Sequence, residues 1–155
     1  MNITLNLAER KLAEYLAKCR YTQARENGRV DQKVGKQSNW QTDLEGIGAE
    51  LAYCKLFNLY PDTETTGHTP DEDAVHHTGQ SVDVKATKYK SGHLVAVLGK
   101  AEHPAEHYCM MIGTFPHYRF AGYVHHEKLF RDENIKDLGH GPGYALGQDQ
   151  LEGAI

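Results

Sequence analysis

Residues 79–87, GQSVDVKAT, decide the fold. A glycine turn leads into a run with valine at every second position, which is the pattern of a β-strand with one buried face. The same alternation puts Asp83 and Lys85 together on the opposite face of that strand. The sequence therefore predicts a strand that presents an acid and a base side by side.

The segment before this strand, DAVHH at 73–77, predicts its hairpin partner, with residues 78–80 as the connecting loop. In that register Asp73 pairs with Lys85 on the charged face, and Asp71 lies one step further along. A two-residue loop would instead put both aspartates on the face opposite the acid–base pair. Asp73 is therefore the first candidate for a third charged residue, and Asp71 is the alternate.

A helix with an acidic residue at its boundary precedes the hairpin. Thr42 and Glu45 have the spacing of a capping box, and the apolar residues that follow recur at helical spacing until near Asn58. Glu50 falls at the edge of the apolar arc, whereas Glu45 points almost the opposite way and is explained by the cap. Glu50 is therefore the candidate site residue from this helix.

The first part of the chain is basic. Residues 6–20 predict a first helix with Asn6 as its N-cap, and residues 26–41 read as a loop. Between residues 10 and 36 there are eight bases and three acids, so this segment carries +5 and the remainder −9 of a net −4. Such asymmetry is found in segments that bind polyanions. We expect phosphate contacts from the N-terminal helix and loop, about 6–41, and from the turn after the charged strand: Arg25, Arg29, Lys33, Lys36 and Lys88.

Further strands follow the hairpin. Segments 93–98, 108–115 and 118–125 have β-strand patterns, residues 126–132 predict a short helix, and residues 143–151 predict a last edge strand. The sequence therefore predicts one α/β or α+β domain over residues 1–155, with a central mixed β-sheet flanked by helices.

Composition excludes several classes of protein. No apolar stretch approaches the roughly 20 residues that span a bilayer, and the N-terminus does not read as a signal peptide. Cys19, Cys54 and Cys109 lie far apart with no CxxC pairing, which favours free thiols and a cytoplasmic protein. No P-loop, GxSxG elbow or dinucleotide-binding glycine pattern is present in the sequence.

The order of the charged residues resembles the PD-(D/E)xK nuclease superfamily. The chain reads helix Glu50, then Pro70-Asp71 or Asp73, then Asp83-Val84-Lys85, over roughly residues 42–98. The resemblance, to small phage or mobile-element members, implies a restriction-endonuclease-like core and an endonuclease acting on DNA, with a homodimer allowed. It also implies that Glu50, Asp73 (or Asp71) and Asp83 hold Mg²⁺ or Mn²⁺ and that Lys85 is catalytic.

The chemistry of phosphodiester hydrolysis suits these residue types. Mg²⁺ prefers hard oxygen ligands and keeps several waters, so two or three carboxylates suffice, and a nearby lysine can hold the phosphate or orient water. Two alternatives stay open at this point. One is a catalytically silent nucleic-acid-binding or protein-interaction module on the same fold, and the other is a mixed-sheet protein whose acidic cluster is merely solvated.

Overall fold

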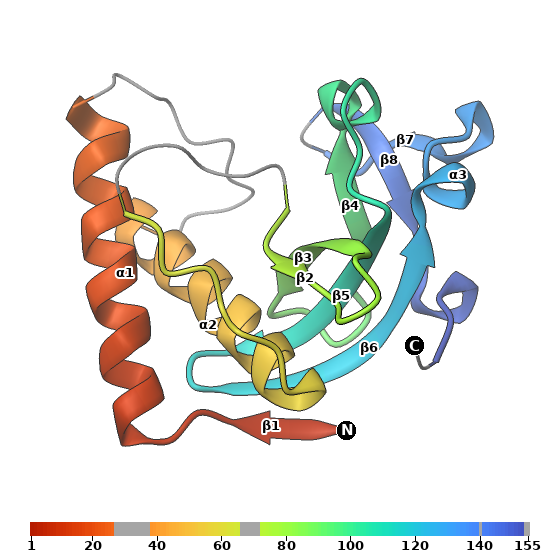
Figure 1. Ribbon diagram of the computed structural model, residues 1–155. Coiled ribbons are helices and arrows are strands. Elements are labelled where there is room, and N and C mark those ends of the chain that lie inside the picture. The colour runs from red at the N-terminus through yellow and green to blue at the C-terminus, as the bar shows by residue number, and fades with distance from the viewer. Residues whose placement is uncertain (27–37, 66–71, 140, 154–155) are drawn as a thin grey trace.

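The computed structural model describes residues 1–26, 38–65, 72–139 and 141–153, and it is an α+β fold (Figure 1). A five-stranded sheet has the order β1-β6-β5-β3-β2, and a three-stranded sheet has the order β4-β8-β7. The strands of the larger sheet are β1 (Asn2–Thr4), β2 (Ala74–Val75), β3 (Ser81–Thr87), β5 (His107–Thr114) and β6 (His117–His125). Those of the smaller sheet are β4 (Leu94–Val97), β7 (Ile135–Asp137) and β8 (Pro142–Leu146). The helices are α1 (Leu7–Glu26), α2 (Asn39–Phe57) and α3 (His126–Leu129), with 3₁₀ turns η1 (Leu98–Ala101), η2 (Asp132–Asn134) and η3 (Gln148–Gln150).

The larger sheet is mixed and has different cover on its two faces. Helix α2 packs on one face and α1 packs outside α2 (Figure 1). The other face packs against residues of β4, β8 and the short helix α3, so the two long helices lie on one side of the sheet. Strand β5 is buried on both faces: Cys109 and Met111 belong to the core under the helices, and Met110 and Ile112 to the core under the small sheet.

Strand β3 runs parallel to β5, and every other pairing between named strands is antiparallel. Parallel neighbours cannot be joined by a tight turn, so the chain must leave the sheet and return between them. Strand β4 and turn η1 form part of this crossover. The crossover therefore places residues of the small sheet and of η1 beside β3.

The start of α1 confirms the predicted cap. The Glu9 N–H donates to Asn6 Oδ1 over 3.0 Å, and the Asn6 N–H donates to Glu9 Oε2 over 2.6 Å, so the two side chains satisfy each other's backbone donors. The helix continues to Glu26, well past the predicted end at residue 20.

The predicted start of α2 is wrong. Ser38 is the N-cap, its side chain accepting from the Gln41 N–H, so the helix begins at Asn39 and Thr42 lies inside it. Glu45 is therefore not part of a capping box. Its Oε2 instead accepts from the Phe115 N–H over 2.7 Å, which ties α2 to the turn between β5 and β6. The end of α2 is as predicted, with the following Asn58 in the left-handed conformation that closes many helices.

The hairpin forms with a register shifted from the predicted one. Ala74 pairs with Val82 and Val75 with Ser81, so the turn contains His77. In the predicted register, with Asp73 opposite Lys85, Val75 would instead have paired with Asp83. The shift is by two positions across the pair, so the side chains keep the predicted faces.

Strands β4, β5 and β6 lie within one residue of their predicted bounds, but the last predicted strand, residues 143–151, ends at Leu146 and is followed by η3. Strand β8 lies in the middle of its sheet and not at an edge, and neither β1 nor β7 was predicted. Both unpredicted strands have three residues, too few for a periodic pattern. The three cysteines are free, as expected. No helix among the described ranges has the length and apolar character needed to cross a membrane.

Helix α2 approaches β6 so closely that a side chain does not fit at Gly48. A Cβ there would collide with the Tyr118 hydroxyl and lie 2.9 Å from Cδ2 of Phe115, while a Cβ at Gly46 would meet nothing within 4 Å. We therefore expect Gly48→Ala to destabilise the protein by about 1–3 kcal/mol through overpacking. The matched control Gly46→Ala, on the same helix, should gain up to about 1 kcal/mol from helix propensity. Urea unfolding of both variants measures the difference, and equal midpoints would contradict this packing.

Candidate active site

Asp83 and Lys85 lie on the face of β3 that is turned away from the helices. In the parallel register Asp83 stands beside Tyr108 and Lys85 beside Met110. Val82 and Val84 point the other way, into the core under α2. The strand faces are thus as predicted, but the acid is not solvated, because only 2% of Asp83 is exposed.

Each carboxylate oxygen of Asp83 faces a lysine. Lys85 Nζ lies 2.5 Å from Oδ1, and Lys100 Nζ lies 3.2 Å from Oδ2. The lysine side chains are 30% and 31% exposed, so their ammonium groups connect a buried carboxylate to the solvent. Oδ1 makes an ion pair but no hydrogen bond of good geometry within the described part of the chain.

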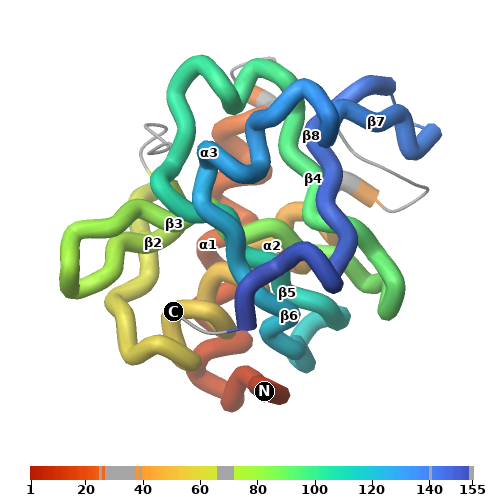
Figure 2. The backbone as a smooth tube through the Cα atoms, turned by 90° about the vertical axis from the view of Figure 1, so that its right-hand side faces the viewer, coloured from red at the N-terminus to blue at the C-terminus, as the bar shows by residue number. Residues whose placement is uncertain are grey.

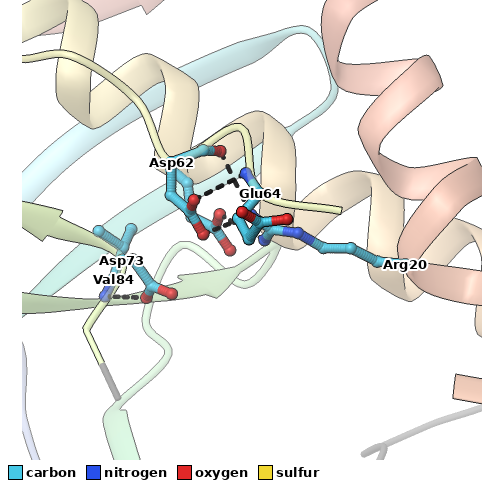
Figure 3. Close-up of polar contacts among 6 residues, drawn as sticks. Arg20, Asp62, Glu64, Asp73 and Val84 are labelled. Carbon is cyan, nitrogen blue, oxygen red and sulfur yellow. Dashed lines mark hydrogen bonds and ion pairs between the residues drawn. The ribbon is translucent and has the colours of Figure 1, made fainter. Parts of the chain in front are cut away.

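Asp73 caps the open edge of β3. Its N–H donates to the Val82 carbonyl over 2.9 Å, and its Oδ2 accepts from the Val84 N–H over 2.7 Å (Figure 3). Strand β2 begins only at the next residue, Ala74, so the Asp73 carboxylate takes the place that a further residue of that strand would occupy. This contact fixes the position of Asp73 relative to β3.

Glu50 is held by an arginine from α1. Arg20 Nη1 donates to Glu50 Oε2 over 3.0 Å, and Nη2 donates to Asp62 Oδ2 over 2.9 Å. Asp62 in turn accepts the Glu64 N–H at its other oxygen, over 2.8 Å. Figure 3 shows Arg20 extending from its helix to Asp62, with Asp73 and Val84 nearby. One guanidinium therefore joins α1, α2 and the segment that follows α2.

Glu50 and Asp73 both have raised pKa values. Burial raises the pKa of Asp73 well above its usual value; the Glu50 and Asp83 charges raise it further, and the Val84 N–H and Lys85 oppose the rise. Burial also raises the pKa of Glu50, against the effect of Arg20 and with smaller contributions from Asp62 and Asp83. The Asp83 charge therefore acts on both other acids, although Asp83 lies on the face of β3 that is turned away from α2 and Glu50 comes from α2.

The donor set suits a hard divalent cation. It consists of carboxylate oxygens, which Mg²⁺ and Mn²⁺ prefer, and the buried Asp83 Oδ1 still has hydrogen-bonding capacity. In the described ranges no three His, Cys, Asp or Glu side chains already stand in metal-binding geometry. The carboxylates are instead turned toward internal donors: Arg20 for Glu50, the Val84 N–H for Asp73, and two lysines for Asp83.

Three residues of the cluster were missed by the sequence analysis. Lys100 and Asp62 have no spacing that links them to the Asp-x-Lys pair, and Arg20 was counted only as part of a basic segment. Lys100 reaches Asp83 because the crossover returns η1 to β3. A signal for it would have required knowing that β3 and β5 are parallel.

Several of the predicted site residues lie outside the part of the chain that the structure describes. Asp71, Arg29, Lys33 and Lys36 lie outside the described residues, as does the side chain of Arg25. Lys88 is described and exposed, in the turn that follows β3.

Comparison with known proteins gives no relative: no protein-family model, curated protein or solved structure matches the chain.

Asp73→Asn should raise the melting temperature at neutral pH. The pKa of Asp73 is higher in the folded protein than in the unfolded chain, so the folded state disfavours its charged form. The resulting loss of stability is absent while the acid is protonated in both states, and it develops as the pH rises from the unfolded pKa through the folded pKa. Asparagine Oδ1 can still accept the Val84 N–H, so the variant removes the charge and keeps this contact.

Thermal unfolding from about pH 4 to about pH 8 tests this, because the gain should shrink toward the acid end, near the ordinary pKa of aspartate. Asp132→Asn, at an exposed position on η2, is the control and should melt like the wild type. A melting temperature of Asp73→Asn at or below the wild type at neutral pH would contradict the clustering of charge.

Proposed function

We propose that this protein is a metal-dependent nuclease that hydrolyses DNA phosphodiester bonds, with a restriction-endonuclease-like core of the PD-(D/E)xK type. The observation that carries the proposal is Asp83, a buried carboxylate with a lysine at each oxygen, whose charge contributes to the raised pKa of both Glu50 and Asp73. Clustering buried acids costs stability, and such clusters are characteristic of catalytic sites.

In this proposal Glu50, Asp73 and Asp83 hold Mg²⁺ or Mn²⁺. A bound divalent ion lowers the pKa of a coordinated water and neutralises charge that develops on the phosphate. The two lysines act on the substrate. Lys85 Nζ, partly open to solvent and 2.5 Å from Asp83, can orient the attacking water or donate to a phosphate oxygen.

The reaction is hydrolysis: the water oxygen bonds to phosphorus as the bond from phosphorus to the leaving oxygen breaks. The leaving oxygen takes up a proton. By likeness to the superfamily the products carry a 5′-phosphate and a 3′-hydroxyl. The Lys100 ammonium, at the other carboxylate oxygen of Asp83, can hold a second phosphate oxygen while charge accumulates there.

The second candidate function is a module that binds nucleic acid on the same fold without turnover. It is favoured by the internal pairing of the acids, because Arg20 and the two lysines already neutralise the cluster. The two functions differ in whether divalent metal produces cleavage.

Incubation of the purified protein with linear, supercoiled, branched and single-stranded DNA tests the proposal. Cleavage should require Mg²⁺ or Mn²⁺ and should not be supported by Ca²⁺, whose larger and looser coordination shell holds the reacting groups less tightly. Glu50→Gln, Asp73→Asn and Asp83→Asn should each lower the cleavage rate by at least about a hundredfold, since loss of even an indirect metal partner costs 10–100-fold.

Glu45→Gln is the matched control for Glu50→Gln, because it changes acid to amide on the same helix and can still accept the Phe115 N–H. It should retain wild-type activity. DNA binding with no metal-dependent product from any of the four substrates would instead favour the binding module.

Lys100→Met separates a role on the substrate from simple neutralisation of Asp83. Removing the ammonium frees Asp83 Oδ2, so we expect Mn²⁺ to bind several-fold more tightly by calorimetric titration. Single-turnover cleavage at saturating metal should nevertheless fall by about tenfold or more, through loss of a charge-assisted contact to the phosphate.

Lys100→Arg should restore part of the rate, because it keeps the positive charge. Lys136→Met, at an exposed position on β7, should change neither quantity. If Lys100→Met cleaves as fast as the wild type once metal is saturating, Lys100 only balances charge.

A further inference from the structure

The turn between β3 and β4, residues 87–92, presents an aromatic ring between two lysines. Tyr89 is 57% exposed, Lys88 and Lys90 are exposed on either side of it in the chain, and Lys88 Nζ lies 5.5 Å from the centre of the Tyr89 ring. In Figure 2 this green turn projects from the body of the molecule below β4. None of these three side chains belongs to either core of the described protein.

The backbone of the turn is fixed. The Tyr89 N–H donates to Thr87 Oγ1 over 3.3 Å, and the Gly92 N–H donates to the Tyr89 carbonyl over 2.9 Å. From η3, Gln148 Nε2 donates to the carbonyls of Lys90 and Gly92, over 2.8 and 3.0 Å. A Cβ on Gly92 would lie 2.9 Å from the Thr87 side chain, so the turn is also tightly closed.

Gln148, whose side chain holds this turn, is itself held in place. Gln148 Oε1 accepts from Arg119 Nη2 over 3.2 Å, so the amide group of Gln148 is engaged at both of its ends. The protein thus holds the backbone of residues 89–92 firmly while leaving the Tyr89 ring exposed. A ring in a fixed position loses little freedom when a flat partner stacks on it.

The chemistry of the turn matches a nucleic-acid strand. Positive charges that attract phosphates, combined with an aromatic face on which a base can stack, form the usual arrangement for binding unpaired nucleotides. The turn also lies close to the candidate active site. Lys88 is three residues beyond Lys85, a distance of about 10 Å along an extended strand, which is the length of a few nucleotides.

We propose that residues 87–92 form a stacking site for an unpaired nucleotide next to the phosphate that is cleaved, with Tyr89 stacking on the base and Lys88 and Lys90 contacting the flanking phosphates. In a continuous duplex both faces of each base are covered by its neighbours, so the site selects DNA with a single-stranded, gapped or branched region. This inference rests on the proposed nuclease function for its placement beside a scissile phosphate, and it names the class of DNA that is cleaved.

Equilibrium binding without divalent metal tests the inference while no cleavage occurs. The probes are a fluorescein-labelled single-stranded oligonucleotide, the matching intact duplex, and that duplex with a short gap. Tyr89→Leu should weaken binding to the single-stranded and gapped DNA by about 5–100-fold, the range found for losing one stacked base. Binding to the intact duplex should change by less than about twofold, because phosphate contacts dominate there.

Two further variants isolate the ring. Tyr89→Phe keeps the aromatic face and should bind like the wild type. Tyr60→Leu removes a tyrosine that is 83% exposed but is followed by Asp62 and Glu64, and it should leave all three affinities unchanged.

Several outcomes overturn the stacking site: unchanged binding by Tyr89→Leu, an equal loss for all three DNAs, an equal loss for Tyr89→Phe, or no binding of any DNA by the wild type. A wild type that cleaves DNA while Tyr89→Leu binds normally overturns this inference alone. A wild type that shows the predicted Tyr89 dependence but cleaves nothing with Mg²⁺ overturns the nuclease function alone.

Discussion

The parallel pairing of β3 with β5 is the constraint on which the rest of the structure depends. It buries β5 on both faces, which creates two cores and requires a second layer on the side away from the helices. It also requires a crossover, and this crossover carries Lys100 back to the strand that bears Asp83. A tight antiparallel turn in its place would lack η1 and so would remove the contact of Lys100 with Asp83.

The candidate site contains buried charges, and one of them, Arg20, also joins α1, α2 and the segment after α2. A buried aspartate flanked by two lysines, and a glutamate held by an arginine, pay a desolvation cost that apolar side chains of similar size would avoid. The cores on either side of β5 are otherwise composed of ordinary apolar residues. The metal-dependent hydrolysis that we propose would account for charge at such a position.

Local sequence patterns predicted local structure, but they did not predict contacts between distant segments. The cap at Asn6, the end of α2 at Asn58 and the faces of β3 each follow from a few neighbouring residues, and all three are confirmed. The capping box at Thr42 was wrong: the Glu45 carboxylate instead accepts a hydrogen bond from the Phe115 N–H, 70 residues away. The candidate site shows the same division between local and distant contacts.

The Asp-x-Lys pair and Glu50 could be selected as candidates from spacing and periodicity, because each depends on one element. Lys100, Arg20 and Asp62 could not, because their roles arise from a crossover and from the packing of α1 on α2. The hairpin register lay between these cases. The predicted faces of its side chains were right, because side chains alternate between the two faces of a strand. The position of the turn was not, because it depends on hydrogen bonds around His76.

At the proposed metal site, the internal pairing of the acids would make cation binding an exchange reaction. A divalent ion that reaches Asp83 or Glu50 must displace an ammonium or a guanidinium that is already there, so the free energy of binding is a difference between two ionic contacts and not the full strength of one. Under the proposed function the polypeptide would fold before it binds the ion, in contrast to small zinc domains that fold only when loaded. Lysines released by such an ion would then be available to a phosphate.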